Sequence, residues 1–169
     1  ILGNHELNVL RGAVKEGNGW FFEANHDHAE GKFLEAKSAA AAERDDILAF
    51  FAALPVVLER PDLRLVHAAW DDAALSLLRE SRAPTVDLYK AYAARAKDVA
   101  QQSGLGERAT EDWRAHGASL KDPLARMPLV EKLGGLDALN QMANPVRIAT
   151  SGPESLAPEP FFASGKWRM

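Results

Sequence analysis

Three chemically different polar side chains follow one another near the start of the chain, at Asn4, His5 and Glu6. They stand after two apolar residues and a glycine, and before an apolar segment suited to a helix. This order predicts the end of a buried strand, a tight turn and the start of a helix. In α/β proteins the turns at the carboxyl ends of strands carry the ligand sites. An amide oxygen, an imidazole and a carboxylate in such a turn therefore indicate a functional site.

A second candidate is His67, which ends an apolar segment. Residues 55–59 and 63–67 are rich in leucine and valine, and the intervening Arg60-Pro61-Asp62 has the composition of a turn. Two short strands joined in this way are expected to form a hairpin. His67 would then lie where the second strand leaves the hairpin.

The two candidate stretches carry a resemblance to a known family. Residues 3–6, Gly-Asn-His-Glu, and residues 66–68, Val-His-Ala, resemble two blocks of the calcineurin-like metallophosphoesterases, which include serine/threonine phosphatases and bacterial diadenosine tetraphosphatases. The resemblance extends over residues 1–12 and 55–72. It implies an α/β fold of the four-layer αββα sandwich type, incomplete at both ends of this chain.

The resemblance also implies a centre of two divalent metal ions, with Asn4 and His67 as metal ligands. His5 becomes the general acid that protonates the leaving oxygen. Paired metals clamp the attacking and leaving oxygens of a phosphoryl displacement and make hydroxide available at neutral pH. Imidazole together with a carboxamide oxygen favours Mn²⁺, with Fe or Zn as alternatives. The implied reaction is hydrolysis of a phosphomonoester or phosphoanhydride by direct attack of water, on a phosphoprotein, a dinucleotide or a small phosphoester.

Three further blocks of the family have no counterpart in the sequence: Asp-x-His, Gly-Asp-x-x-Asp-Arg and Gly-His-x-His. We therefore expect the chain to be a fragment, with the first two blocks before Ile1 and the third after Met169. The fragment alone is expected to be inactive, because phosphoryl transfer depends on metals for charge stabilisation. Ala69 also departs from the family, which often has glycine at that position.

The same residues have structural interpretations. Asn4 could simply tolerate a turn conformation beside Gly3. Glu6 is expected to be structural, since a carboxylate stabilises the first turn of a helix. A histidine at a strand end, such as His67, is more often a hydrogen-bonded core residue than a ligand. The pairing of the two blocks is what favours a functional role.

Other residues are weaker candidates. The stretch His26-Asp27-His28 could bind a metal with Glu23 or Glu30 as a third ligand, but its composition favours a solvated loop. The family that the chain resembles uses arginines to hold the phosphate, so the resemblance implies three candidates, among which the sequence does not distinguish: Arg11, Arg64 and Arg147.

The elements expected around these residues make one domain of residues 1–169. A helix is predicted from Ser38, as its N-cap, to residue 54, where Pro55 ends it. A helical insertion is predicted over residues 73–143, in which Gly134-Gly135 should break the last helix. The alternation of apolar side chains over residues 146–150 predicts a strand.

Composition limits the function classes. The formal charge of −4 and a pI near 5.7 disfavour a nucleic acid or an anionic membrane as partner. The absence of cysteine excludes disulfides and thiolate sites. Without a long apolar run or a signal peptide, a cytoplasmic location is expected. Two alternatives remain open at this point: a non-catalytic α/β interaction module, and a mostly helical binding protein whose core is residues 38–54, 85–102 and 129–143.

Overall fold

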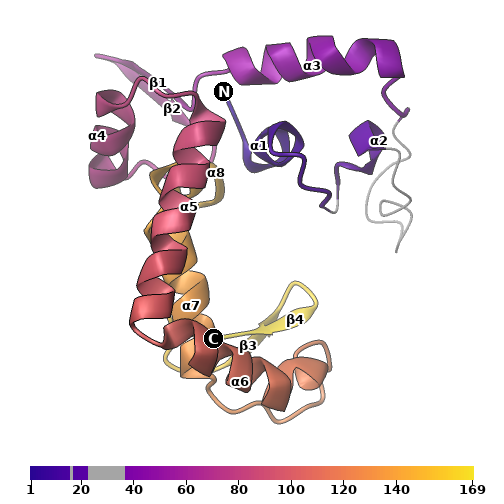
Figure 1. Ribbon diagram of the computed structural model, residues 1–169, viewed down its shortest axis with the longest axis vertical. Helices are drawn as coiled ribbons and strands as arrows, with labels where there is room; N and C mark the ends of the chain where they lie inside the picture. Colours follow the sequence, from indigo (N-terminus) through magenta and orange to yellow (C-terminus); the bar gives the residue numbers. More distant parts are fainter. Residues whose placement is uncertain (16, 23–36) are drawn as a thin grey trace. The chain divides into compact units, whose positions relative to one another are not determined.

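The structure of the protein is a computed structural model that describes residues 1–15, 17–22 and 37–169 (Figure 1). The predicted loop at His26-Asp27-His28 lies outside the described residues. The described chain divides into two compact units. Unit 1 comprises residues 1–89 and 146–152, and unit 2 comprises residues 90–145 and 153–169.

Unit 1 begins with three helices, α1 (Asn4–Leu10), α2 (Gly19–Phe22) and α3 (Ala41–Ala53). A small apolar core joins them, made by one buried side chain near the end of α1, one in α2 and one before α3: Val9, Phe21 and Ala39. Ile47, Leu48 and Phe51 of α3 pack against this core, and the predicted helix is confirmed. Phe50, by contrast, is 62% exposed.

The predicted N-cap of α3 was wrong. The cap is Ala40, whose backbone N–H donates to Oε2 of Glu43 at 2.9 Å. The carboxylate of Glu43, three residues into the helix, thus accepts from the N–H of the cap residue itself, and this cap lies two residues after Ser38 and makes no side-chain hydrogen bond. The predicted end of the helix before Pro55 is confirmed, with Leu54 as the C-cap.

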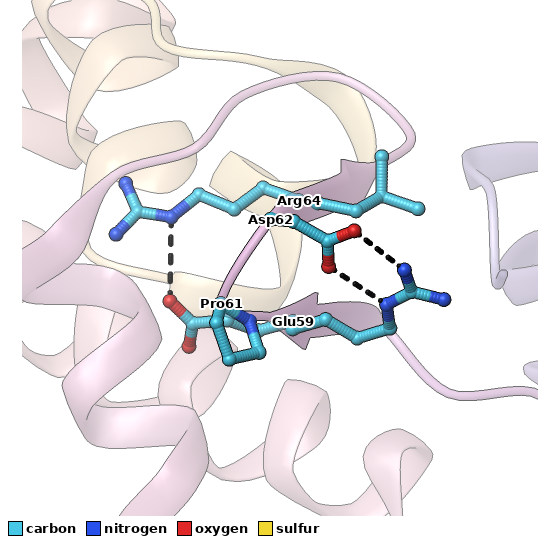
Figure 2. A pocket seen from close by; sticks show the side chains of 6 residues that line it. Glu59, Pro61, Asp62 and Arg64 are labelled. Carbon is cyan, nitrogen blue, oxygen red and sulfur yellow. Dashed lines mark hydrogen bonds and ion pairs between the residues drawn. The ribbon is translucent and has the colours of Figure 1, made fainter.

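The predicted hairpin is confirmed as β1 (Val57–Arg60) and β2 (Leu63–Val66), which pair antiparallel from Val57 opposite Val66 to Arg60 opposite Leu63. Two ion pairs hold its exposed surface (Figure 2). Arg60 bonds Asp62 across the turn with Nη2 to Oδ2 at 2.6 Å, and Nε of Arg64 lies 3.3 Å from Oε1 of Glu59. The bond to Arg60 lowers the pKa of Asp62 from its ordinary value.

Helix α4 (Asp72–Glu80) follows the hairpin and is capped by Asp71. Its Oδ1 accepts a hydrogen bond from the backbone N–H of Ala74 at 2.8 Å. We expect Asp71→Ala to lower the free energy of unfolding by about 1 kcal/mol, because a free N–H group at the helix start loses its partner. Urea unfolding followed by circular dichroism measures this loss, and Asp71→Asn, which keeps the acceptor, should retain most of the stability.

The predicted strand at residues 146–150 was wrong, since Pro145–Ser151 form helix α8. Proline is well suited to the first position of a helix, where its missing N–H is not required. Val146, Ala149 and Thr150 are all buried, and their i, i+3, i+4 spacing places them on one face of a helix. The Thr150 hydroxyl donates to the Val146 carbonyl at 2.8 Å, a bond that only the helical backbone permits.

Unit 2 is built from helices and one hairpin. It contains most of α5 (Thr85–Gln102), then α6 (Leu105–His116), a 3₁₀ turn (Gly117–Ser119), α7 (Glu131–Met142), and the strands β3 (Phe161–Ala163) and β4 (Lys166–Arg168). Helices α6 and α7 pack against each other. The helical character predicted for residues 73–143 is thus confirmed by helices α4 to α7.

The predicted break at Gly134-Gly135 was wrong, because α7 runs through both residues. Gly134 is buried, and a Cβ atom there would lie 2.5 Å from Cβ of Met169 and 2.7 Å from Cδ1 of Leu156. The glycine is therefore required for close packing rather than for a change of backbone direction.

The α/β class is confirmed by this mixture of helices and antiparallel strands. Within the described residues the strands form two sheets of two strands each. The four-layer arrangement remains a prediction. No helix in these parts of the chain combines the length and the apolar character needed to cross a membrane.

Candidate functional site

The first predicted block lies at the start of α1 in unit 1. Leu2 is 1% exposed, and its N–H donates to the Pro55 carbonyl at 2.8 Å, which ties the block to the chain leading into β1. Gly3 is the N-cap with φ −103° and ψ 179°, an extended conformation open to any residue. The sequence predicted a tight turn at this point. In the structure, extended chain at Gly3 leads directly into helix α1 instead.

Glu6 satisfies the free N–H group at this helix start. Its Oε2 accepts a hydrogen bond from the backbone N–H of Gly3 at 3.0 Å. This bond and the negative charge in the first turn both stabilise the helix. The structural role predicted for Glu6 is confirmed.

His67 lies at the exit of β2, and the next residue is anchored to α8. The Ala68 N–H donates to the Ala149 carbonyl at 3.0 Å, which fixes the direction of the chain beyond the hairpin. His67 is exposed. The alternative that it is a buried core histidine is therefore wrong.

The structure brings His67 against the first block. A Cβ atom built on Gly3 would lie 2.8 Å from both Nδ1 and Cε1 of His67, and 2.6 Å from Oε2 of Glu6. The imidazole and the carboxylate thus flank the same glycine, and only a residue without a side chain leaves room for both. Sequence reasoning missed this requirement for Gly3, because the atom that approaches it comes from a residue far along the chain.

Asn4 and His5 occupy the first turn of α1, with Asn4 half-buried and His5 exposed. Among the described residues, the side chains of Asn4, His5 and His67 form no hydrogen bond or ion pair with another group. An amide oxygen and two imidazoles are therefore available to a ligand from solvent.

The donor atoms at this site indicate whether a metal ion would fit there. An amide oxygen and an imidazole are suitable ligands for Mn²⁺, Fe or Zn. The part of the chain that the structure describes contains no group of three His, Cys, Asp or Glu side chains arranged to hold a metal ion. The residues are thus of the right kind but too few to hold a metal tightly on their own.

The three candidate arginines have different surroundings. Arg64 is exposed on the hairpin, where it pairs with Glu59 and lies over the Trp70 ring at 4.8 Å. Arg11 follows the end of α1 and Arg147 belongs to α8, yet both reach the buried ring of Tyr89. Arg11 and Arg147 are therefore brought together at the ring of Tyr89.

Two of the concave surfaces on the described part of the chain are defined by their lining residues. One is an open hollow on the β1–β2 hairpin, lined by residues 59–64 (Figure 2). The other, of about 430 Å³, lies in unit 2 between α6, α7 and the β3–β4 hairpin, with Trp113 and Trp167 in its wall. Neither contains Asn4, His5 or His67.

Comparison of the chain with models of protein families, with curated proteins and with solved structures gave no match.

Proposed function

We propose that this chain contributes part of the active site of a metal-dependent phosphoesterase, which hydrolyses a phosphomonoester or phosphoanhydride by direct attack of water. The parent fold would be the four-layer αββα sandwich. The observation that carries the proposal is the contact between the His67 imidazole and Gly3. It joins two short blocks, separated by some sixty residues, at one place on the surface, as a shared metal centre requires.

In this proposal Asn4 and His67 bind a divalent metal through the amide oxygen and an imidazole nitrogen. Bound there, Mn²⁺ or a similar ion would supply a Lewis acid and a hydroxide at neutral pH. His5 would donate a proton from an imidazole nitrogen to the leaving oxygen, the role of a positioned general acid. The remaining ligands would come from residues other than those described. The protein would act in the cytoplasm on a phosphoprotein, a dinucleotide or a small phosphoester.

Binding of Mn²⁺ tests the metal site directly. A ligand that binds only the folded state raises its stability, by about 2.7 kcal/mol when its concentration is a hundred times Kd. In the parent protein, which would supply the remaining ligands, we expect Mn²⁺ to raise the melting temperature and EDTA to reverse the rise. Asn4→Ala and His67→Ala should each abolish the rise, whereas the matched control His116→Ala, which removes an imidazole from unit 2, should preserve it.

Gly3→Ala is a sharper variant, because it removes no ligand. The added methyl group must displace the imidazole of His67 or the carboxylate of Glu6, since both lie under 3 Å from its position. We expect weaker Mn²⁺ binding with the helical signal retained. A wild-type parent protein whose melting temperature is unaffected by Mn²⁺ would reject the metal site and favour the non-catalytic interaction module.

The role of His5 is separable from that of the ligands. In the parent protein, His5→Ala should retain the Mn²⁺-dependent rise in melting temperature and lose about 10²–10⁴-fold in the rate of phosphate release, the usual contribution of a positioned proton donor. Equal loss of metal binding and hydrolysis would instead make His5 a ligand.

A further inference from the structure

The cavity of about 430 Å³ in unit 2 has a wall suited to the body of a small organic molecule. Its volume is in the range of sites for such ligands. Leu120, Leu133 and Met169 contribute apolar side chains to the wall, and Trp113 and Trp167 contribute two indole rings. Ligand sites are lined mainly by apolar and aromatic side chains of this kind, with a few polar groups that set orientation.

The indole ring of Trp113 is held in place and yet remains open to solvent. A Cβ atom built on Gly117 would lie 3.0 Å from Cδ2 and Cε2 of Trp113, so the ring lies against the glycine. Trp113 is nevertheless 56% exposed, and within the described part of the chain its indole N–H has no acceptor. The indole N–H of Trp167, by contrast, donates to the Asp122 carbonyl at 2.8 Å. Trp113 therefore offers a ring surface and a donor that these residues leave unused.

Charged side chains of both signs line the same cavity. Two are carboxylates, Asp137 and Glu154, and three are cations, Lys121, Lys166 and Arg168. Among the residues that the structure describes, none of the five forms an ion pair, either with another of them or with a group elsewhere. The opposite charges thus line one cavity without reaching each other.

A ligand with a single charge would meet like charges in this cavity, which is unfavourable. A zwitterion offers a partner to each sign, and hydrogen bonds between ionised groups are stronger than those between neutral ones. Arg168 is half-buried, and its planar guanidinium group matches the two oxygens of a carboxylate. Asp137 stands four residues after Leu133 in α7, so its carboxylate belongs to the same side of the helix as the apolar wall.

We propose that this cavity binds a free α-amino acid with an aromatic side chain. The ring of the ligand lies against Trp113, its carboxylate binds Arg168, and its ammonium group binds Asp137 and Glu154. An aromatic body is favoured because contacts between rings are more favourable than their buried area alone accounts for. The site shares no residue with the proposed metal centre and needs no metal ion. It therefore goes beyond the proposed function and stands or falls independently of it.

The experiment titrates the chain with L-phenylalanine in the presence of EDTA. Binding is followed by calorimetry and by tryptophan fluorescence, excited where phenylalanine does not absorb. Three analogues each lack one feature of the probe: 3-phenylpropionate lacks the ammonium group, phenethylamine lacks the carboxylate, and glycine lacks the ring. We expect saturable binding of L-phenylalanine and an affinity at least about tenfold lower for each analogue, because a protein group then loses its partner or the ring is no longer buried.

Two results of this titration would overturn the proposal. The absence of saturable binding of L-phenylalanine would remove the site altogether. An analogue that binds as tightly as L-phenylalanine would show that the cavity does not recognise the group which that analogue lacks.

The double variant Asp137→Asn/Glu154→Gln tests the partners of the ammonium group, and both side chains are exposed, so the fold should be retained. L-Phenylalanine should bind at least about tenfold more weakly, whereas 3-phenylpropionate, which has no ammonium group, should bind at least as tightly as it does to the wild type. The matched control Asp98→Asn/Glu111→Gln removes two exposed carboxylates of unit 2 that do not line the cavity, and it should bind both ligands as the wild type does. An unchanged affinity for L-phenylalanine, or equal losses for both ligands, would overturn the assignment.

Variants of Arg168 and Trp113 test the other two contacts. Arg168→Gln should remove the preference for L-phenylalanine over phenethylamine, and Arg168→Lys, which keeps the charge but loses the planar fork, should be intermediate. Trp113→Leu should weaken the binding of L-phenylalanine, whereas Trp113→Phe, which keeps a ring, should retain most of it. A preference that persists in Arg168→Gln, or equal affinities in the two variants of Trp113, would contradict the proposed orientation of the ligand.

Discussion

Leu75→Ala is expected to lower the free energy of unfolding by about 2–5 kcal/mol, the range for truncating a buried leucine. Leu75 is 1% exposed and belongs to α4. The loss combines the transfer of the removed methyl groups with a cavity that the surroundings fill only in part. Urea unfolding followed by circular dichroism measures it as a fall in the midpoint with an unchanged slope.

Leu77→Ala is the matched control, because it makes the same chemical change in the same helix at a side chain that is 42% exposed. We expect it to cost less than about 1 kcal/mol, as surface substitutions usually do. If the two variants lost the same stability, the face of α4 assigned to the core of unit 1 would be wrong.

Gly134→Ala and Gly135→Ala are expected to change stability in opposite directions. At Gly134 the new methyl group meets Cβ of Met169 at 2.5 Å, and Met169 also places its carbonyl oxygen 3.3 Å away. Overpacking of this kind typically costs about 1–3 kcal/mol. At Gly135 the nearest atom, Cδ1 of Leu105, is 4.0 Å away, so the gain of about 1 kcal/mol in helix propensity is realised.

The two variants should therefore differ by about 2–4 kcal/mol in the free energy of unfolding of unit 2. Fluorescence of Trp113 and Trp167, both in unit 2, can be compared with circular dichroism in the same urea titration. Stabilisation by both substitutions would mean that the packing of Leu156 and Met169 on α7 is not maintained in solution.

Local signals in the sequence predicted much of the secondary structure. The hairpin followed from apolar residues on either side of Arg60-Pro61-Asp62, and those residues form β1, the turn and β2. The end of α3 followed from Pro55, and Leu54 is its C-cap. Such features depend on groups a few residues apart, whose geometry the local backbone determines.

Errors arose where local patterns were ambiguous. Positions 146, 148 and 150 fit the period of a strand, whereas Val146, Ala149 and Thr150 fit one face of a helix, and the chain forms the helix α8. At Gly134 the intrinsic preference against helix was overridden because the chain end packs on that spot. In both cases the conformation was determined by residues that lie too far along the sequence for a local pattern to include them.

In the candidate site, too, some features followed from the sequence and others only from the tertiary structure. The sequence by itself determined the chemistry available: an amide, two imidazoles and several arginines, with no cysteine. Only the tertiary structure decided which of them meet, bringing His67 to Gly3, and Arg11 and Arg147 to Tyr89. The physical reason is that side-chain types are fixed residue by residue, whereas proximity between distant residues depends on how buried groups such as Leu2 and Tyr89 pack.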